Sequence, residues 1–204
     1  MAIANGRNNM LASIEDSASM LNSLVDELDR FYSNKLTDFE RKIDLLRIEN
    51  KNEEPKVLCS MCSDWNYAIS IYDELFTETK EMLICKVYSY AEKHMSELLS
   101  LIGYSHKKIS NEYKSSNPST RGISDIEKCC YVLQNYFGLE QNLLDINWPI
   151  FKDFHKTRKE IEHRYDHNAT IDIKMIKGNL DYAMQLLKHI ELVTREKRLD
   201  ISDN

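Results

Sequence analysis

Glycine and proline are scarce in this 204-residue chain, which has only 5 glycines and 3 prolines. Because these residues mark most turns, their scarcity predicts few turns and long elements. Runs of valine, isoleucine and threonine that alternate with polar residues between turn signals are also missing, which argues against a sheet. With 42% apolar and 29% charged residues, the chain can bury a core within one domain. We therefore expect an all-α helical bundle.

Long apolar runs are missing too. The N-terminal sequence, MAIANGRNNMLASIEDS, has no apolar segment behind a basic start. No uninterrupted apolar run approaches the length that spans a bilayer. The 5 cysteines are an odd number and, without an export signal, are typical of reduced cytosolic thiols. We expect a cytoplasmic protein that has no membrane partner.

The chain has no excess of positive charge. A net charge of -6 argues against proteins that coat nucleic acid by neutralising many phosphates. The charge is uneven, however. Residues 15–54 hold eleven acids and six bases, whereas residues 104–121 hold four bases and one acid. A local site for a polyanion therefore remains open, and we expect the polar stretch 104–122 to be an exposed loop.

The longest periodic segment runs from residue 9 to about residue 49. Its apolar positions are three or four residues apart, the pattern of a heptad stripe with one extra step of four near Tyr32. This predicts one long amphipathic helix whose partner helix lies either in the same chain or in another molecule. We divide the chain into this helix (1–55), packing on the bundle, and the bundle itself (56–204). The stripe comprises Leu11, Ile14, Ala18, Leu21, Val25, Leu28, Tyr32, Leu36, Phe39, Ile43 and Leu46.

Further helices are predicted after a connection at residues 50–60. The first covers roughly 65–102, allows a break at 77–80, and ends at Gly103. Ser124 and Glu127 form a capping box that starts a short helix ending at Gly138. Two more are expected, from Asn147 to about Tyr165 and from about 173 to 197.

The helix PIFKDFHKTRKEIEHRYDH, residues 149–167, concentrates the reactive side chains. Three of the six histidines fall here among lysines and arginines. His155, Lys159, His163 and His167 are four residues apart in turn, which predicts one polar stripe. Arg158 lies at the edge of the apolar face, rotated well away from His163 on an ideal helix. An imidazole can transfer protons near neutrality, and a guanidinium binds phosphate through two hydrogen bonds.

Arg158 and His163 form an Arg-x4-His motif near the end of this helix. The motif resembles that of the HEPN (higher eukaryotes and prokaryotes nucleotide-binding) family, and the upstream stretch KVYSYAEKHMSELL, which contains Glu92, is similar to a family helix. The resemblance covers roughly residues 60–196. It departs from the family where Lys159 follows the arginine in place of the usual asparagine, aspartate or histidine.

The resemblance implies a small helical bundle that acts as a metal-independent endoribonuclease, without a cofactor. Arg158 would stabilise the scissile phosphate and His163 would act as general acid or base, in a site assembled across a homodimer. Lys159, Arg164 and His167 would contact the RNA. Small proteins of this kind look most like toxin–antitoxin or antiviral defence components, which also implies an antitoxin or another partner protein.

Three alternatives remain open from the sequence. Arg158 and Glu162 are spaced as an ordinary surface ion pair. Cys59 and Cys62 have the residue types and spacing to form a zinc site with His163 and His167. The chain can also be a non-catalytic module that binds a protein through its long N-terminal helix, or that binds RNA.

Overall fold

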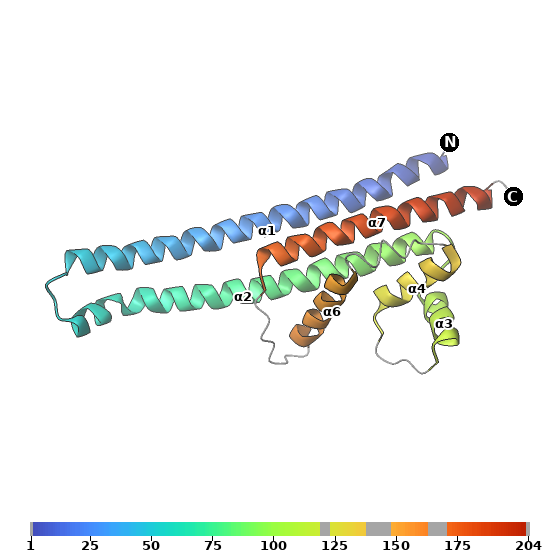
Figure 1. The fold of residues 1–204 in the computed structure, drawn as a ribbon. Helices are drawn as coiled ribbons and strands as arrows, with labels where there is room; N and C mark the ends of the chain where they lie inside the picture. Colours follow the sequence, from blue (N-terminus) through green and yellow to red (C-terminus); the bar gives the residue numbers. More distant parts are fainter. Residues whose placement is uncertain (1, 119–122, 138–147, 163–170, 203–204) are drawn as a thin grey trace.

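The structure, a computed structural model, describes residues 2–118, 123–137, 148–162 and 171–202. Within these ranges the regular structure is helical throughout, as predicted. The two longest helices, α1 (Ala2–Glu49) and α2 (Pro55–Ser100), form an antiparallel hairpin (Figure 1). None of the described helices is long and apolar enough to cross a membrane.

The hairpin is covered by other helices over only part of its length. A third long helix, α7 (Ile173–Ser202), packs against α1 and α2 near the chain termini (Figure 1). The short helix α6 (Trp148–Glu162) packs on α2. The last two, α3 (His106–Ser116) and α4 (Asp125–Phe137), pack together beside the C-terminal end of α2. Beyond the start of α7, the hairpin extends as a two-helix arm (Figure 1).

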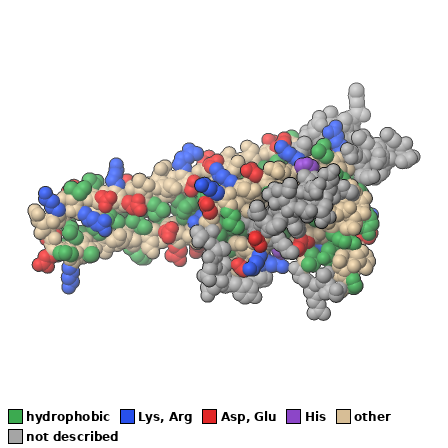
Figure 2. Space-filling model, viewed as in Figure 1, with side chains coloured by type: hydrophobic (Ala, Val, Ile, Leu, Met, Phe, Trp, Pro, Cys, Tyr) green, Lys and Arg blue, Asp and Glu red, His purple; other side chains and the backbone are tan. Residues whose placement is uncertain are grey.

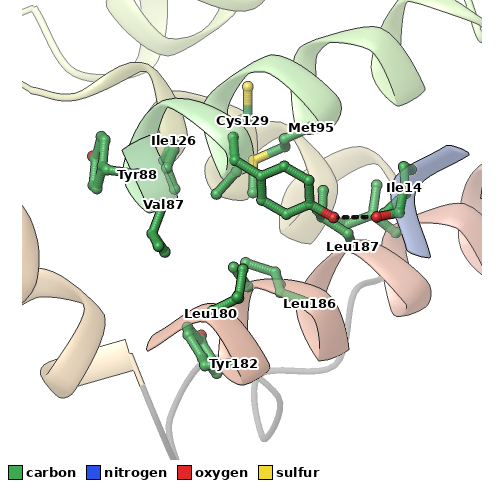
Figure 3. Close-up of a cluster of buried hydrophobic side chains, with 14 of the residues drawn as sticks. Ile14, Val87, Tyr88, Met95, Ile126, Cys129, Leu180, Tyr182, Leu186 and Leu187 are labelled. Carbon is green, nitrogen blue, oxygen red and sulfur yellow. Dashed lines mark hydrogen bonds between the residues drawn. The ribbon is translucent and has the colours of Figure 1, made fainter. Parts of the chain in front are cut away.

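The core joins the N-terminal helix to the rest of the molecule. Ile14 of α1, Val87 and Met95 of α2 and Leu187 of α7 belong to one buried cluster, in which Figure 3 shows Ile14 beside Leu187. The Tyr90 hydroxyl donates a 2.7 Å hydrogen bond to the Ile14 carbonyl oxygen, drawn as a dashed line in Figure 3. The apolar stripe of α1 is therefore used within the chain.

Two predicted features of α2 are wrong. The connection before it spans residues 50–54 rather than 50–60, because Pro55 occupies the first turn of α2, where an amide donor has no partner. The break allowed at 77–80 does not occur. The Thr79 hydroxyl donates to the Leu75 carbonyl oxygen at 2.7 Å and lies 3.2 Å from the Tyr32 hydroxyl, so a polar side chain is accommodated within a continuous helix.

The predicted loop at 104–122 is also wrong, because residues 106–116 form α3. The Ser105 side chain accepts a hydrogen bond from the Lys108 amide at 3.3 Å and caps this helix. Ile109 is buried, and the Tyr113 ring meets the Tyr131 ring of α4 edge-on at 5.2 Å. One apolar contact surface is therefore enough to order a helix that is otherwise polar.

Other predicted boundaries are confirmed. Gly103, at φ 80°, follows the end of α2. The capping box at the start of α4 is present: the Ser124 amide donates to Glu127 at 3.1 Å, and the Glu127 amide donates to Ser124 at 3.2 Å. Gly138 and the end of the predicted 147–165 helix lie outside the described residues. The last helix continues to Ser202, beyond the predicted end at 197.

Candidate functional site around Arg158

α6 lies against the covered half of α2 and carries the arginine of the predicted motif. Its inner face includes Thr157, which is buried, and Ile161, which packs against the core. Pro149 sits in its first turn, where the absence of an amide donor costs nothing. These contacts fix the rotation of the helix, so that Arg158 projects along the junction between α6 and α2.

Arg158 is held by two carboxylates and an aromatic ring. Its Nη1 donates to Glu92 Oε2 of α2 at 3.2 Å, and its Nε donates to Glu162 Oε1 at 2.9 Å. The guanidinium carbon lies 4.5 Å from the centre of the Tyr88 ring. The side chain is 18% exposed. The ion pair with Glu162 expected from the i,i+4 spacing is confirmed, and Glu92 adds a partner 66 residues away.

The charges at this junction attract one another in a partly buried setting. Burial raises the pKa of the Glu92 carboxyl, and the nearby Arg158 charge opposes this shift only in part. The pKa of Arg158 is raised, because attraction to Glu92 and Glu162 outweighs burial. Arg158 therefore stays charged, and the two carboxylates stabilise this charge at the partly buried junction.

His155 is in a different position from the one predicted. Its ring stacks on the Tyr88 ring with centres 4.9 Å apart, so it is not part of an exposed polar stripe. Both ring nitrogens are buried and have no hydrogen-bond partner among the described residues. Burial, followed by repulsion from Lys159, lowers the pKa of His155. The imidazole is therefore neutral at neutral pH and serves as a packing ring.

The predicted site residues divide into two groups. Arg158 and Lys159 are described, and Lys159 is exposed on α6. His163, Arg164 and His167 lie outside the described residues. The structure therefore gives the environment of the predicted phosphate-binding group but not that of the predicted acid or base.

A polar cavity of about 270 Å³ lies beside Glu92, between α2, α3 and α4. His106 Nε2 is 2.9 Å from Asp125 Oδ2 on one wall, and Lys128 donates to the same carboxylate at 2.6 Å. Burial acts to raise the pKa of Asp125, but the bonds to Lys128 and His106 outweigh it and leave the pKa lowered. This cluster is not predicted by any local sequence pattern, because His106 and Asp125 lie 19 positions apart.

The cysteines do not form a metal site with other described residues. Cys62 is buried against α1, whereas Cys59 is exposed, and both lie near the far end of the hairpin. Within the described ranges, no group of three or more histidine, cysteine or acidic side chains is arranged to hold a metal ion. Burial raises the pKa of Cys129 to about 12, so this thiol is a packing residue.

Comparison with known proteins adds no relative to these observations. No family model matches the chain, and no curated protein or solved structure is significantly similar to it.

Proposed function

We propose that the protein is a metal-independent endoribonuclease of the HEPN type, in which Arg158 stabilises the phosphate and His163 transfers protons. One observation carries the proposal. The two segments that resemble the family, around Glu92 in α2 and Arg158 in α6, meet through the 3.2 Å ion pair between these residues. Segments chosen for resemblance alone have no reason to be adjacent, so their contact supports a common site.

The chemistry fits these side-chain types. The RNA 2′-hydroxyl oxygen attacks phosphorus as a base removes its proton, and the bond to the 5′-oxygen breaks as an acid protonates it. The products are a 2′,3′-cyclic phosphate and a 5′-hydroxyl. His163 can serve in either proton transfer, while a guanidinium stabilises the charge on the phosphate oxygens.

Arg158 has hydrogen-bonding capacity left for a phosphate. A guanidinium has five N–H donors, and among the described residues only Nε and Nη1 are bound to carboxylates. Glu92 and Glu162 would then hold the guanidinium in place through Nη1 and Nε, while the remaining donors face the substrate. Lys159, which follows Arg158 in the sequence, is exposed. Together with Arg164 and His167, it would extend the contact along the RNA.

The site requires a second copy of the chain. His163 lies five positions after Arg158, a rotation of about 140° on an ideal helix, so the two side chains diverge. A two-fold dimer that brings two α6 helices to one cleft would place the arginine and histidine of different copies at one phosphate. Such an enzyme would act as a toxin or antiviral effector that an antitoxin holds in check.

Cleavage of RNA in the presence of a chelator tests this proposal. Purified protein is incubated with total RNA and EDTA, beside His163→Ala and Arg158→Ala variants that retain helical circular dichroism. We expect cleavage by the wild type with cyclic-phosphate ends. Each variant should lose at least about a hundredfold in rate, because His163→Ala removes the proton transfer and Arg158→Ala removes the stabilisation of charge on the phosphate. Lys156→Ala, an exposed change on the same helix, should keep activity. Cleavage that persists in both site variants would contradict the proposal.

A second function, a non-catalytic interaction module, is favoured by the arm of the hairpin. Its side chains include large exposed apolar groups, and Figure 2 shows hydrophobic side chains reaching the surface along it. Leu21 and Leu28, which the sequence pattern placed on the binding stripe, pack on the core instead. A binding surface on the hairpin must therefore use other residues.

A further inference from the structure

An apolar groove runs along the side of the α1–α2 hairpin that α7 leaves uncovered. The groove encloses about 570 Å³ and is lined by Met20 and Leu24 of α1 together with Lys86, Ser89 and Lys93 of α2. α7 binds the opposite side, since Lys177 of α7 pairs with Asp26. Two residues, or about 200° of helical rotation, separate Leu24 from Asp26.

The groove continues along the arm as an apolar stripe. Residues seven apart stay on one side of a helix in a heptad-packed hairpin. On α1, steps of seven residues from Leu24 reach Phe31, Asp38 and Leu45. On α2, Met82 lies one turn from Lys86, and steps of seven residues back along the helix start from it. Apart from Asp38, the members are apolar. We call this set the docking stripe: Leu24, Phe31 and Leu45 of α1, and Met61, Ala68, Leu75 and Met82 of α2.

Most members of the docking stripe are exposed, whereas the residues that directly follow them are half-buried or buried. Phe31, Leu75 and Met82 are 48%, 43% and 53% exposed. The hairpin's own contact is made by the residues that follow them, such as Tyr32 and Phe76, whose rings stack at 4.6 Å. The stripe is therefore not required to hold α1 against α2. Isolated exposed apolar groups are common, but a row of them on one face, interrupted here by Asp38 of α1 and the half-buried Ala68 of α2, indicates an interaction surface.

We propose that a second copy of this chain covers the docking stripe, in an antiparallel arrangement with the two-fold axis near Leu75. The charges along α2 support this occupant. Lys86 lies eleven residues to one side of Leu75, and Asp64 lies eleven residues to the other side. A two-fold rotation at Leu75 therefore places Lys86 of each copy opposite Asp64 of the other. It also places Met82 opposite Ala68.

The apolar groups and the available area fit the same arrangement. Along the hairpin, Leu75 of α2 lies opposite Tyr32 of α1, because the Tyr32 ring contacts the rings of Tyr72 and Phe76. Rotation there brings Leu45 of one copy to Met20 of the other, which lines the groove. From Met61 to Lys86 the face is about 37 Å long, and with two helices of about 10 Å each it offers on the order of 750 Å². Stable interfaces bury about 800 Å² per partner.

This dimer is independent of the proposed ribonuclease. Tyr88, which contacts Arg158, lies thirteen residues from Leu75, so the two Arg158 clusters would be separated by about 39 Å along the hairpin. The hairpin dimer therefore does not form a shared catalytic cleft. Its loss would leave the ribonuclease proposal intact, and an inactive protein would leave the hairpin dimer intact.

Sedimentation of charge variants tests the arrangement. We expect self-association through the stripe at micromolar concentration, and Leu75→Glu, which buries charge on the axis, should raise the dissociation constant of this contact at least about a hundredfold. A dimer formed through α6 would be unaffected by this change. Lys86→Glu and Asp64→Lys should each weaken the dimer by repulsion, whereas the double variant Lys86→Glu/Asp64→Lys should restore it. Tyr67→Glu, at an exposed position outside the stripe, is the matched control.

Three outcomes would overturn the proposal. The first is a wild-type chain that stays monomeric at tens of micromolar. This outcome counts against the proposal even if the stripe then binds a different protein. The second is a dimer that tolerates Leu75→Glu with helical circular dichroism retained. The third is a double charge variant that stays as weak as the single variants, because only the antiparallel register places these two residues opposite each other.

Discussion

The two halves of α2 follow the same heptad rhythm in different surroundings. From Leu83 to Leu99 the helix touches α1, α4, α6 and α7, and most of its side chains are buried. From Pro55 to Thr79 the only described helix that it meets is α1, along the arm (Figure 1), and Cys62 is the one buried residue of this stretch. The period of the apolar pattern therefore predicts which residues of α2 face α1. It does not predict how many other helices cover α2.

The halves also stabilise their basic groups differently. In the covered half Arg158 binds Glu92 at a junction closed by packed helices, so each charge depends on the other. In the arm Lys42 binds Asp38 at 2.9 Å and lies 4.5 Å from the centre of the Trp65 ring, but water reaches both charges. The same types of contact should therefore contribute different amounts to folding stability.

The largest expected difference concerns matched isoleucines on α2. Ile84 is fully buried, whereas Ile71 in the arm is 36% exposed. Ile84→Ala should lower the free energy of unfolding by about 3 kcal/mol, and Ile71→Ala by about 1 kcal/mol, because a cavity forms only where neighbours enclose the side chain. Urea denaturation followed by circular dichroism measures both. Equal losses would show that the arm is as well covered as the rest of the helix.

A smaller difference is expected for the two basic residues. Arg158→Ala leaves the Glu92 carboxylate half-buried without its partner and should cost roughly 2 kcal/mol of unfolding free energy. Lys42→Ala, which removes a comparable set of contacts at an exposed site, should cost less than about 1 kcal/mol.

A rescue variant separates charge from packing in the covered half. Adding Glu92→Gln to Arg158→Ala removes the stranded charge and should recover part of the lost stability. If the double variant is no more stable than Arg158→Ala alone, the loss comes from contacts with the Tyr88 ring rather than from the unpaired carboxylate.

Local patterns predicted the elements that depend on local chemistry. The long N-terminal helix follows from apolar spacing, and the start of α4 follows from the capping box of Ser124 and Glu127. The helix α3 was missed because its sequence is polar and basic. What orders it is the burial of Ile109 and a ring contact between Tyr113 and Tyr131 of another helix, which local spacing does not reveal.

The candidate site was predicted only to the extent that it lies on one helix. The pair formed by Arg158 and Glu162 follows from i,i+4 spacing, but the contact with Glu92 depends on how α6 rests on α2. The histidine stripe failed at His155 for the same reason, since Tyr88 of α2 draws that ring inward. The docking stripe was overlooked because the adjacent, stronger stripe already accounted for the helix.

The smallest predicted effect concerns pH and the stacked imidazole of the covered half. The pKa of His155 in the folded protein is lowered from the ordinary value of 6.5, first by burial and then by Lys159. As pH falls below 6.5, the unfolded chain binds the proton before the folded chain does. The stability that His155 contributes is therefore complete above pH 6.5 and is lost as pH falls toward the lowered pKa.

His155→Phe should remove this dependence while keeping the stack on Tyr88. Both imidazole nitrogens lack partners among the described residues, so the change breaks no hydrogen bond seen there. In urea denaturation its stability relative to wild type should therefore stay level from pH 8 to about pH 6.5 and rise as the pH falls further to 5.5. His106→Gln, at an exposed histidine paired with Asp125, is the control and should not give this trend. A constant difference between His155→Phe and wild type would mean that His155 titrates alike in both states, and hence that the covered half shields it no better than the arm would.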